Sequence, residues 1–310
     1  MANPNARIRR YETAALAAAA QAILEGGIVA VPTETVYGLA ADATQAQAVA
    51  NIYAVKGRPA FNPLIVHVAS AAAAEALALF DTDARALAAA FWPGPLTLVL
   101  PLREDAGIAS LVTAGLSTIA IRVPAHRAMQ ALLAATGRPL AAPSANRSNG
   151  ISPTRAGHVA TSLGDTAPLI LDDGPCTAGV ESTIVAGHTI LRQGPVTAAM
   201  IAAVLGRAAV AEGVEAVTAP GQLASHYAPN KPLRLDATGP DPDEWMIGFG
   251  AVTGNDTLSA SGDVVEAASL LFDALHRADA SAKPRIAVAP VPEADIGAAI
   301  ADRLRRAAHH

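Results

Sequence analysis

The sequence predicts an α/β protein with a twisted mixed sheet covered by helices around a central cavity, followed by a small C-terminal α/β domain. In the first 200 residues, Ala- and Leu-rich segments alternate with short runs of β-branched residues, which is the pattern of a sheet packed between helices. Several predicted strands adjoin through short turns, so we expect antiparallel as well as parallel pairs. From Gly213 to Pro232 the periodicity stops, and prolines and glycines indicate a linker.

The strands of the first domain are predicted from short β-branched or apolar runs bounded by Gly, Pro or polar residues. In chain order they cover residues 27–31, 64–68, 96–100, 118–123, 140–142, 169–171 and 182–185, the last turning through Gly187 into 189–192. No GxGxxG follows the first strand, and neither GxxxxGKS nor GxxxxGKT occurs. We therefore expect neither a Rossmann fold nor a P-loop.

The helices are predicted from the Ala- and Leu-rich segments, and Gly206 ends the last one of the first domain. They cover residues 12–25, 45–55, 71–80, 84–91, 126–135, 155–163 and 197–205. Beyond the linker, strands at 233–235, 245–249 and 286–289 and helices at 263–278 and 294–308 are expected. The predicted organisation is a first domain over residues 1–212, a linker over 213–232 and a second domain over 233–310.

Composition narrows the class of protein. With 310 residues, 52% of them hydrophobic and 16% charged, the chain can bury one large core and a smaller second one. No stretch approaches the roughly 20 apolar residues that cross a bilayer, so we expect no membrane contact and a cytoplasmic location. A single cysteine, Cys176, excludes an internal disulfide and a cysteine zinc site. A formal net charge of -5 argues against a protein that mainly grips nucleic-acid phosphates.

Two polar segments follow predicted strands. Residues 32–39 (PTETVYGL) place hydroxyls and a carboxylate at a strand end, where sites in open sheets form, although a self-capped Thr-rich turn explains them equally well. Residues 143–154 (PSANRSNGISPT) combine small polar side chains with a glycine, which can expose backbone N–H groups to an anion. Ser152 or Thr154 can also cap the next helix, and both interpretations can hold together.

Two cations stand isolated near the first segment. Lys56 and Arg58 are the only Lys or Arg residues between Tyr11 and Ala84, and they flank Gly57 just before a strand. A Lys point charge beside an Arg fork in a fixed loop suits a polyphosphate. A solvated surface loop is the alternative, and it explains less well why so basic-poor a region keeps these two charges.

Two further arginines end predicted strands. Arg122 lies among apolar neighbours and Arg192 precedes a glycine turn, so both can face water, or together can bind a carboxylate and a phosphate in one cleft. Glu181-Ser182-Thr183 offers another hydroxyl pair, whereas His67 in a strand is more often a core histidine than a ligand. No GxSxG nucleophile elbow occurs.

In this order, PTETVYGL, KGRPAFNPL, WPGPLT, TIAIRVP, APSANRSNGISPT, ESTIV and ILRQG resemble the motifs of the YrdC-like family of L-threonylcarbamoyladenylate synthases. The linker sequence HYAP at 226–229 and the C-terminal segments resemble the two-domain members. The resemblance implies a YrdC-like catalytic domain with a positively charged cavity, partly closed by the linker. An aromatic residue in a linker without periodicity, Tyr227, suits a lid that excludes water from an adenylate.

The resemblance also implies the site residues. Lys56 and Arg58 would be catalytic, by stabilising charge on the phosphates. Threonine would be bound by Thr35, His67, Arg122, Ala142 and Ser182, and ATP by Lys56, Arg58, Asn62, Thr118, Ser144, Ser152, Arg192 and Tyr227. We expect no metal ligand from the protein, and expect Mg²⁺ to be held mainly by the phosphates.

The implied activity is a nucleotidyltransferase reaction. ATP, bicarbonate and L-threonine would give L-threonylcarbamoyladenylate and pyrophosphate, and a protein partner would transfer the threonylcarbamoyl group to an adenosine of tRNA. The alternative is an RNA-binding or regulatory module of the same fold, which predicts a basic face that a net charge of -5 does not favour. Another carbamoyl-adenylate enzyme would use carbamoyl phosphate within a longer chain that carries zinc-finger-like cysteines, which this sequence lacks.

Overall fold

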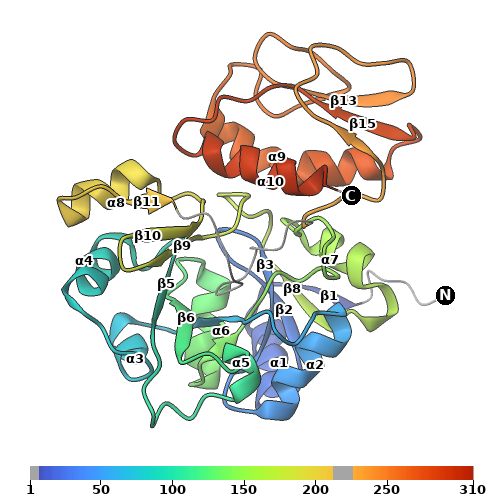
Figure 1. Ribbon diagram of the computed structural model, residues 1–310. Helices are drawn as coiled ribbons and strands as arrows, with labels where there is room; N and C mark the ends of the chain where they lie inside the picture. The colour runs from blue at the N-terminus through green and yellow to red at the C-terminus, as the bar shows by residue number, and fades with distance from the viewer. Residues whose placement is uncertain (1–6, 212–225, 310) are drawn as a thin grey trace.

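The computed structural model describes residues 7–211 and 226–309, and Figure 1 shows them arranged around two sheets. A large mixed sheet belongs to the N-terminal part and a small parallel sheet to the C-terminal part. Residues 213–225 of the predicted linker lie outside the described residues. The boundaries at 212 and 232 therefore remain a proposal.

The large sheet has eleven strands in the order β1-β8-β2-β3-β7-β4-β6-β5-β9-β10-β11. Half of its neighbouring pairs are parallel and half antiparallel, which confirms the mixed sheet that the short turns predicted. Its strands are β1 (Ile8–Arg10), β2 (Val29–Pro32), β3 (Tyr37–Asp42), β4 (Ile65–His67), β5 (Leu96–Pro101), β6 (Thr118–Arg122), β7 (Leu140–Ala141), β8 (Leu169–Asp172), β9 (Thr183–Ala186), β10 (Thr189–Arg192) and β11 (Val210–Ala211).

Helices cover both faces of this sheet. Because side chains alternate along a strand, Val29 and Val31 of β2 join a cluster with α1 and α6, whereas Ala30 joins the core that α2, α4, α7 and α8 complete. The helices of this part are α1 (Thr13–Leu24), α2 (Ala46–Lys56), α3 (Ala71–Glu75), α4 (Thr82–Phe91), α5 (Ser110–Thr113), α6 (Arg127–Thr136), α7 (Ala156–Leu163) and α8 (Ala198–Leu205).

The segment after β2 and the helix over 71–80 differ from the prediction, and β1, α5 and β11 were not predicted. The polar turn is short, and Tyr37 already starts β3, which runs antiparallel to β2. Its Gly and Ala residues are not the β-branched residues from which strands were predicted. A small residue fits here because a Cβ on Gly38 would lie 3.2 Å from the Cβ of Ala142. The helix predicted over 71–80 ends at Glu75, and the amide of Leu79 bonds to the carbonyl of Pro101, the last residue of β5.

The C-terminal part contains a parallel sheet in the order β12-β15-β13-β14 and two helices, α9 (Val264–Ala280) and α10 (Gly297–Ala307). In Figure 1 these helices lie between the small sheet and the rest of the molecule, and their core includes Val36, Ile151 and Val180 of the large part. Across residues 7–211 and 226–309, no helix is long and apolar enough to span a membrane. The strands are β12 (Leu233–Arg234), β13 (Glu244–Gly248), β14 (Asp256–Thr257) and β15 (Arg285–Val288).

Candidate active site

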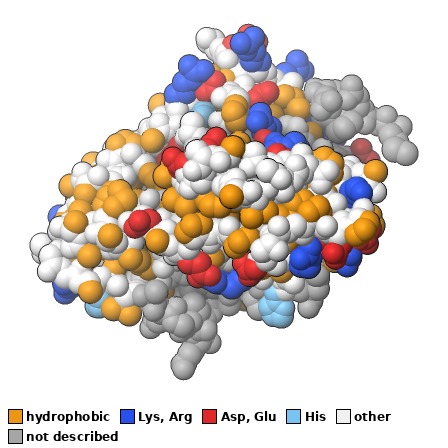
Figure 2. All heavy atoms as spheres, turned by 90° about the horizontal axis from the view of Figure 1, so that it is seen from above, with side chains coloured by type: hydrophobic (Ala, Val, Ile, Leu, Met, Phe, Trp, Pro, Cys, Tyr) orange, Lys and Arg blue, Asp and Glu red, His pale blue; other side chains and the backbone are white. Residues whose placement is uncertain are grey.

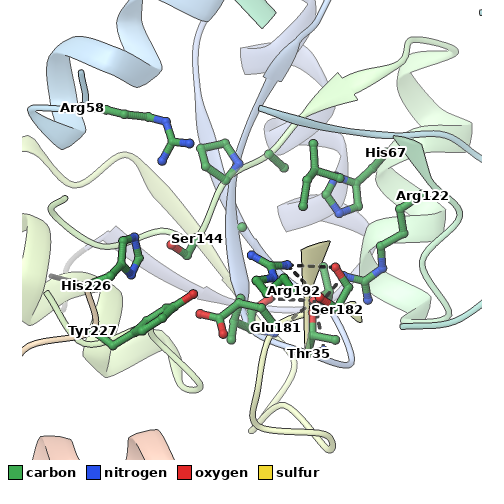
Figure 3. Close-up of a pocket in the computed structure, with 16 residues that line it drawn as sticks. Thr35, Arg58, His67, Arg122, Ser144, Glu181, Ser182, Arg192, His226 and Tyr227 are labelled. Atoms are coloured by element: carbon green, nitrogen blue, oxygen red, sulfur yellow. Dashed lines mark hydrogen bonds between the residues drawn. The ribbon is translucent and has the colours of Figure 1, made fainter. Parts of the chain in front are cut away.

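A cavity lies where strand ends of the large sheet meet, and Figure 3 shows the side chains that line it. His67 and Arg122 are the last residues of the parallel neighbours β4 and β6 and stand side by side in register. The turn between β2 and β3 adds Thr35, and the residue before β9 adds Ser182. Residues that are distant in the chain thus share one wall, as expected for strand ends in an open sheet.

Arg122 is buried at this wall and carries three contacts. Its Nε donates to the Gly94 carbonyl (3.0 Å), Nη1 donates to Oγ1 of Thr35 (2.9 Å), and Nη2 forms an ion pair with Glu34 at 2.6 Å. Burial favours the neutral acid of Glu34, but the charge of Arg122 outweighs it and lowers the pKa of that carboxyl. The sequence analysis predicted that Arg122 binds a ligand carboxylate, and it assigned no individual role to Glu34.

His67 is buried beside Arg122 and remains neutral at physiological pH. Burial lowers the pKa of its imidazole to about 3, and the charge of Arg122 adds to the effect. Within the described part of the chain, its Nδ1 has no hydrogen-bond partner. A buried polar atom without a partner is costly, so a ligand that bonds to it gains affinity. His67 therefore lines the cavity as a histidine available to a ligand, in contrast to the core histidine that is common in strands.

Arg58 supplies positive charge to the opposite side of the cavity (Figure 3). Its guanidinium donates to Oδ1 of Asn62 (2.6 Å) and to the Pro63 carbonyl (2.7 Å), so the loop after α2 fixes its direction. Burial lowers the pKa of Arg58 to about 10, and the nearby charge of Arg192 also lowers it. Asn62 holds Arg58 and is not itself among the lining residues.

Lys56 lies behind the cavity. It is the last residue of α2, and its Nζ donates to the carbonyl of Ser144 (2.5 Å) and to that of Asn146. Burial lowers the pKa of its ammonium well below the usual value, with the charge of Arg58 adding to this. In this structure Lys56 therefore ties the helix end to the loop over 143–154, and Ser144 of that loop lines the cavity.

Arg192 and Glu181 form the third wall. The Nε and Nη2 of Arg192 donate to the Ser182 carbonyl at 3.1 and 2.9 Å, which fixes the guanidinium at the end of β10. Glu181 accepts a hydrogen bond from Oγ of Ser152. Ser152 thus reaches the cavity only through Glu181, a carboxylate for which the sequence analysis had no role.

His226 and Tyr227 enter the cavity from the side opposite His67 and Arg122 (Figure 3). Tyr227 is 1% exposed, and its ring packs 5.6 Å from that of Phe272 on α9. In the described part of the chain, its hydroxyl has no hydrogen-bond partner. The tyrosine of the predicted lid is thus packed against the C-terminal part and presents a polar atom to the cavity.

The predicted site residues fall into two groups. Lys56, Asn62 and Ser152 lie behind the cavity wall. Thr118 is the first residue of β6 and Arg122 is the last, so the two residues are about 13 Å apart along the strand. That position gives no support to an ATP contact by Thr118. The cavity is lined by Thr35, Arg58, His67, Arg122, Ala142, Ser144, Ser182, Arg192 and Tyr227.

The residues that the sequence analysis missed are Glu34, Glu181 and His226, which follow or precede residues that it selected. The sequence feature that could have identified them is a carboxylate or an imidazole directly beside a strand end or beside a hydroxyl residue of a motif. For metal binding, the described residues contain no group of three or more His, Cys, Asp or Glu side chains suited to an ion. The cavity wall, as far as the structure describes it, instead combines three arginines and neutral donors and acceptors with a single carboxylate, Glu181, and this excess of positive charge suits anionic ligands.

Comparison with known proteins gives matches along nearly the whole chain. The family described as "Telomere recombination" matches residues 21–194, and the domain described as "Threonylcarbamoyl-AMP synthase, C-terminal domain" matches residues 196–309. A threonylcarbamoyl-AMP synthase of Bacillus subtilis is 39% identical, with 94% of this chain and 92% of that protein covered. One from Pyrococcus abyssi is 38% identical, with 96% and 95% covered.

Solved structures agree with these matches. The P. abyssi Sua5 structure complexed with L-threonine has a TM-score of 0.88 and 36% sequence identity, with 97% of this chain and 96% of that chain covered. The nucleotide- and phosphate-bound structure of full-length HypF has a TM-score of 0.53 at 19% identity, covers 59% of this chain and 30% of that chain, and so shows the shared fold alone.

Proposed function

The chain belongs to the threonylcarbamoyl-AMP synthase family, and from this premise we propose that it converts ATP, bicarbonate and L-threonine into L-threonylcarbamoyladenylate and pyrophosphate. It is a nucleotidyltransferase whose product serves the threonylcarbamoyl modification of adenosine in tRNA. The observation that supports this most directly is the cavity itself. One wall offers Arg122, Thr35 and neutral His67, and the others offer Arg58 and Arg192.

The first step is carboxylation of the amino acid. The amine nitrogen of threonine forms a bond to the carbon of bicarbonate, water leaves, and N-carboxy-threonine results. Arg122 holds the α-carboxylate through its guanidinium fork, while the neutral ring of His67 accepts a hydrogen bond from the amine. Thr35 and Ser182 then orient the side-chain hydroxyl, and the short side chain of Ala142 leaves room for the threonine methyl group.

The second step is adenylate formation. An oxygen of the new carbamate bonds to the α-phosphorus of ATP, and the bond from that phosphorus to pyrophosphate breaks. Such a transfer needs alignment and charge neutralisation more than covalent help from the protein. Arg58 and Arg192 neutralise the phosphates, Ser144 and Tyr227 donate from their hydroxyls, and Lys56 holds the loop over 143–154 that carries Ser144.

Other parts of the proposal concern groups outside the described protein. Mg²⁺ would be held by the phosphates of ATP and would supply positive charge to the leaving group. We place the reaction in the cytoplasm, with a protein partner that transfers the threonylcarbamoyl group to tRNA. The linker over 213–232 acts as a lid, and Tyr227, packed beside the cavity, is the part of it that touches ligand.

An RNA-binding module of this fold is less well supported. On the face of the described residues that Figure 2 shows, Lys and Arg side chains are interspersed with Asp and Glu and form no broad basic patch. Several arginines of the C-terminal part have acidic partners, among them Arg277 with Asp256 and Arg285 with Asp243. Nucleic-acid phosphates require clustered cations that are available for binding.

The test incubates the protein with ATP, ¹⁴C-bicarbonate and each amino acid in turn, and follows labelled adenylate together with pyrophosphate. We expect equal amounts of both products with L-threonine and background levels with serine, valine or no amino acid. A parallel reaction with carbamoyl phosphate tests the other carbamoyl-adenylate chemistry. Pyrophosphate release that does not depend on threonine, or that depends on carbamoyl phosphate, would reject the proposed function.

A further inference from the structure

A buried arginine of the C-terminal part reaches the wall of the cavity. Arg303 belongs to α10 and is 0% exposed. Its Nε donates to Oε2 of Glu181 at 2.9 Å, and its Nη2 donates to the carbonyl of Gln193 at 2.8 Å. Both acceptors belong to the large part of the molecule, on either side of the β9–β10 hairpin. The C-terminal part thus contributes a charged group to the back of the site.

The contacts of Arg303 lead to Tyr227, which lines the cavity. Through Glu181 they also lead to Ser152, which the sequence analysis assigned to ATP and which lies behind the wall. Glu181 uses its other carboxylate oxygen to accept the hydrogen bond from Ser152. The guanidinium carbon of Arg303 also lies 5.3 Å from the centre of the Tyr227 ring, within the range of a cation–π contact. Asp302, its neighbour on α10, accepts a third hydrogen bond at 2.8 Å, so the position of the guanidinium is fixed from its own helix.

The charge balance explains why an arginine is needed here. Burial would raise the pKa of Glu181, but the guanidinium groups of Arg303 and then Arg192 outweigh it and keep the carboxylate ionised. A buried carboxylate that loses such a partner either takes up a proton or turns toward another cation. Here the other cation is Arg192, which lines the phosphate side of the cavity.

We propose that Arg303 is a positioning residue for the ATP half of the site: from the C-terminal part it fixes Glu181, and through Glu181 Ser152, and it holds the ring of Tyr227 in place. The contacts of Arg122, Thr35 and His67 lie outside this network. Loss of Arg303 should therefore affect ATP far more than threonine. This inference rests on the proposed function, because it divides that site into an ATP half and a threonine half.

The test uses the full-length chain and a matched pair of variants. Arg303→Met removes the buried guanidinium, whereas the control Arg305→Met removes a surface arginine of the same helix, which pairs with Glu293 and is itself 57% exposed. Calorimetric titration measures ATP and L-threonine binding, and steady-state pyrophosphate release gives KM for each. We expect Arg303→Met to weaken ATP binding about tenfold or more and threonine binding less than about threefold, and the control to change neither.

Two further variants keep the proposal open to refutation if Arg303→Met does not fold. Arg303→Lys keeps the charge without the fork, so we expect an intermediate loss of ATP binding. In a Glu181→Gln background the buried charge is already absent, so Arg303→Met should cost a clearly smaller factor than in the wild type. Equal losses for ATP and threonine, or the same factor in both backgrounds, would overturn the positioning role.

Hydrogen exchange separates this proposal from the proposed function. In ligand-free protein, we expect Arg303→Met to speed amide exchange at Tyr227 and Ala228 about tenfold, while the strands β4 and β6 stay protected. This measurement needs no ATP. If the wild type releases no pyrophosphate, the proposed function fails, and unchanged exchange in the variant would still reject the positioning role.

Discussion

Single residues of the cavity show where sequence patterns are informative and where they are not. The isolation of Lys56 and Arg58 predicted a shared role, yet only Arg58 lines the cavity, because Gly57 between them adopts a left-handed conformation (φ 60°) and turns the chain. The amino-acid composition of a segment does not reveal a change of backbone direction at a single residue. Positive charge was therefore predictable, whereas the direction of each side chain was not.

The two cations should respond differently to substitution. Arg58→Ala should lower pyrophosphate release about tenfold or more, because a charge-assisted contact to phosphate contributes roughly 1.5–3 kcal/mol. Tm should fall less than in the Lys56→Met variant, because the Asn62 carbonyl keeps the Tyr53 hydroxyl as a donor. Oδ1 of Asn62 and the Pro63 carbonyl lose the donor that Arg58 provides. Initial rates and calorimetric melting of Arg58→Ala measure both quantities, with surface Arg103→Ala as the control.

Lys56→Met is the counterpart of this experiment. It leaves the carbonyls of Ser144 and Asn146 without their donor, so we expect Tm to fall by several degrees together with the rate. If Arg58→Ala keeps the wild-type rate, Arg58 is not a phosphate contact. If Lys56→Met melts like the wild type, the tie between α2 and the loop over 143–154 contributes little to stability.

Arg122 gives the second residue-level prediction. Its fork contacts Thr35 and Glu34 at once, and a lysine cannot reproduce that geometry. Arg122→Lys should weaken L-threonine binding at least about tenfold and leave ATP binding within about twofold. Calorimetric titration of each ligand checks this, and equal effects on the two ligands would remove Arg122 from the threonine pocket.

Glu34 and Glu181 show the limit of prediction at this scale. Each adjoins a residue that the motifs selected, so their neighbourhood was predictable. Their roles depend on arginines far away in the chain, Arg122 for one and Arg303 for the other. A single sequence does not reveal such pairs, because ion pairs across a fold leave no periodic pattern.

Among the secondary-structure elements, the long periodic segments were predictable, and so were the short strands β4, β7 and β12, whereas the short strands β1, β11 and β14 were not. The strands at 96–100 and 118–123 and the helices at 126–135 and 263–278 correspond closely to β5, β6, α6 and α9. β1, β11 and β14 have two or three residues each, and they form strands because they pair with a neighbouring strand. Their existence depends on tertiary contacts that local propensity does not report.

One glycine controls how closely two elements approach. Gly179, in the loop before β9, has φ +70°, and a Cβ there would lie 2.4 Å from the carbonyl oxygens of Ala268 and Ser269 on α9. Gly206 ends α8 with a similar φ of +67°, but a Cβ there would meet nothing within 4 Å. The two positions share the backbone strain and differ only in the clash.

Gly179→Ala should therefore destabilise the protein more than Gly206→Ala does. Both substitutions cost about 1–2 kcal/mol from the left-handed backbone, and only Gly179→Ala must also push α9 away. We expect Tm to fall by a few degrees for Gly206→Ala and clearly further for Gly179→Ala, with ATP affinity reduced only in the latter. Equal melting temperatures would show that α9 yields without cost.

For the whole molecule, the sequence predicted two α/β units and a linker but not how they meet. The contact surface combines an apolar cluster with polar links: Arg155 of the large part pairs with Asp273 of α9, which Arg277 of the same helix also holds, and the rings of His158 and His276 stack at 3.8 Å. These residues are spread over more than a hundred positions. Their complementarity exists only once both units are folded, so no local pattern could predict it.

This contact surface should make stability depend on pH. Burial lowers the pKa of His276 to about 3 from the ordinary 6.5, and the charge of His158 adds to the effect. Between these values the unfolded chain binds a proton that the folded protein does not, so stability is highest above pH 6.5 and falls as pH decreases. At pH 5.5 the loss from this residue is about 1.4 kcal/mol, because protonation places a charge on a buried ring.

His276→Gln should remove that part of the pH dependence. Since about 1 kcal/mol corresponds to roughly 1.5 °C for a chain of 310 residues, the drop in Tm between pH 7.5 and 5.5 should be smaller by about 2 °C in the variant. Buried His67 and His226, whose pKa values are also lowered, leave a residual slope, so the slope should shrink and not vanish. Exposed His188→Gln serves as the control and should match the wild type. An unchanged pH dependence of Tm in His276→Gln would contradict this assignment. It would mean that the protonated ring of His276 in the wild type is stabilised by water or by Asp273, although two arginines already bind that carboxylate.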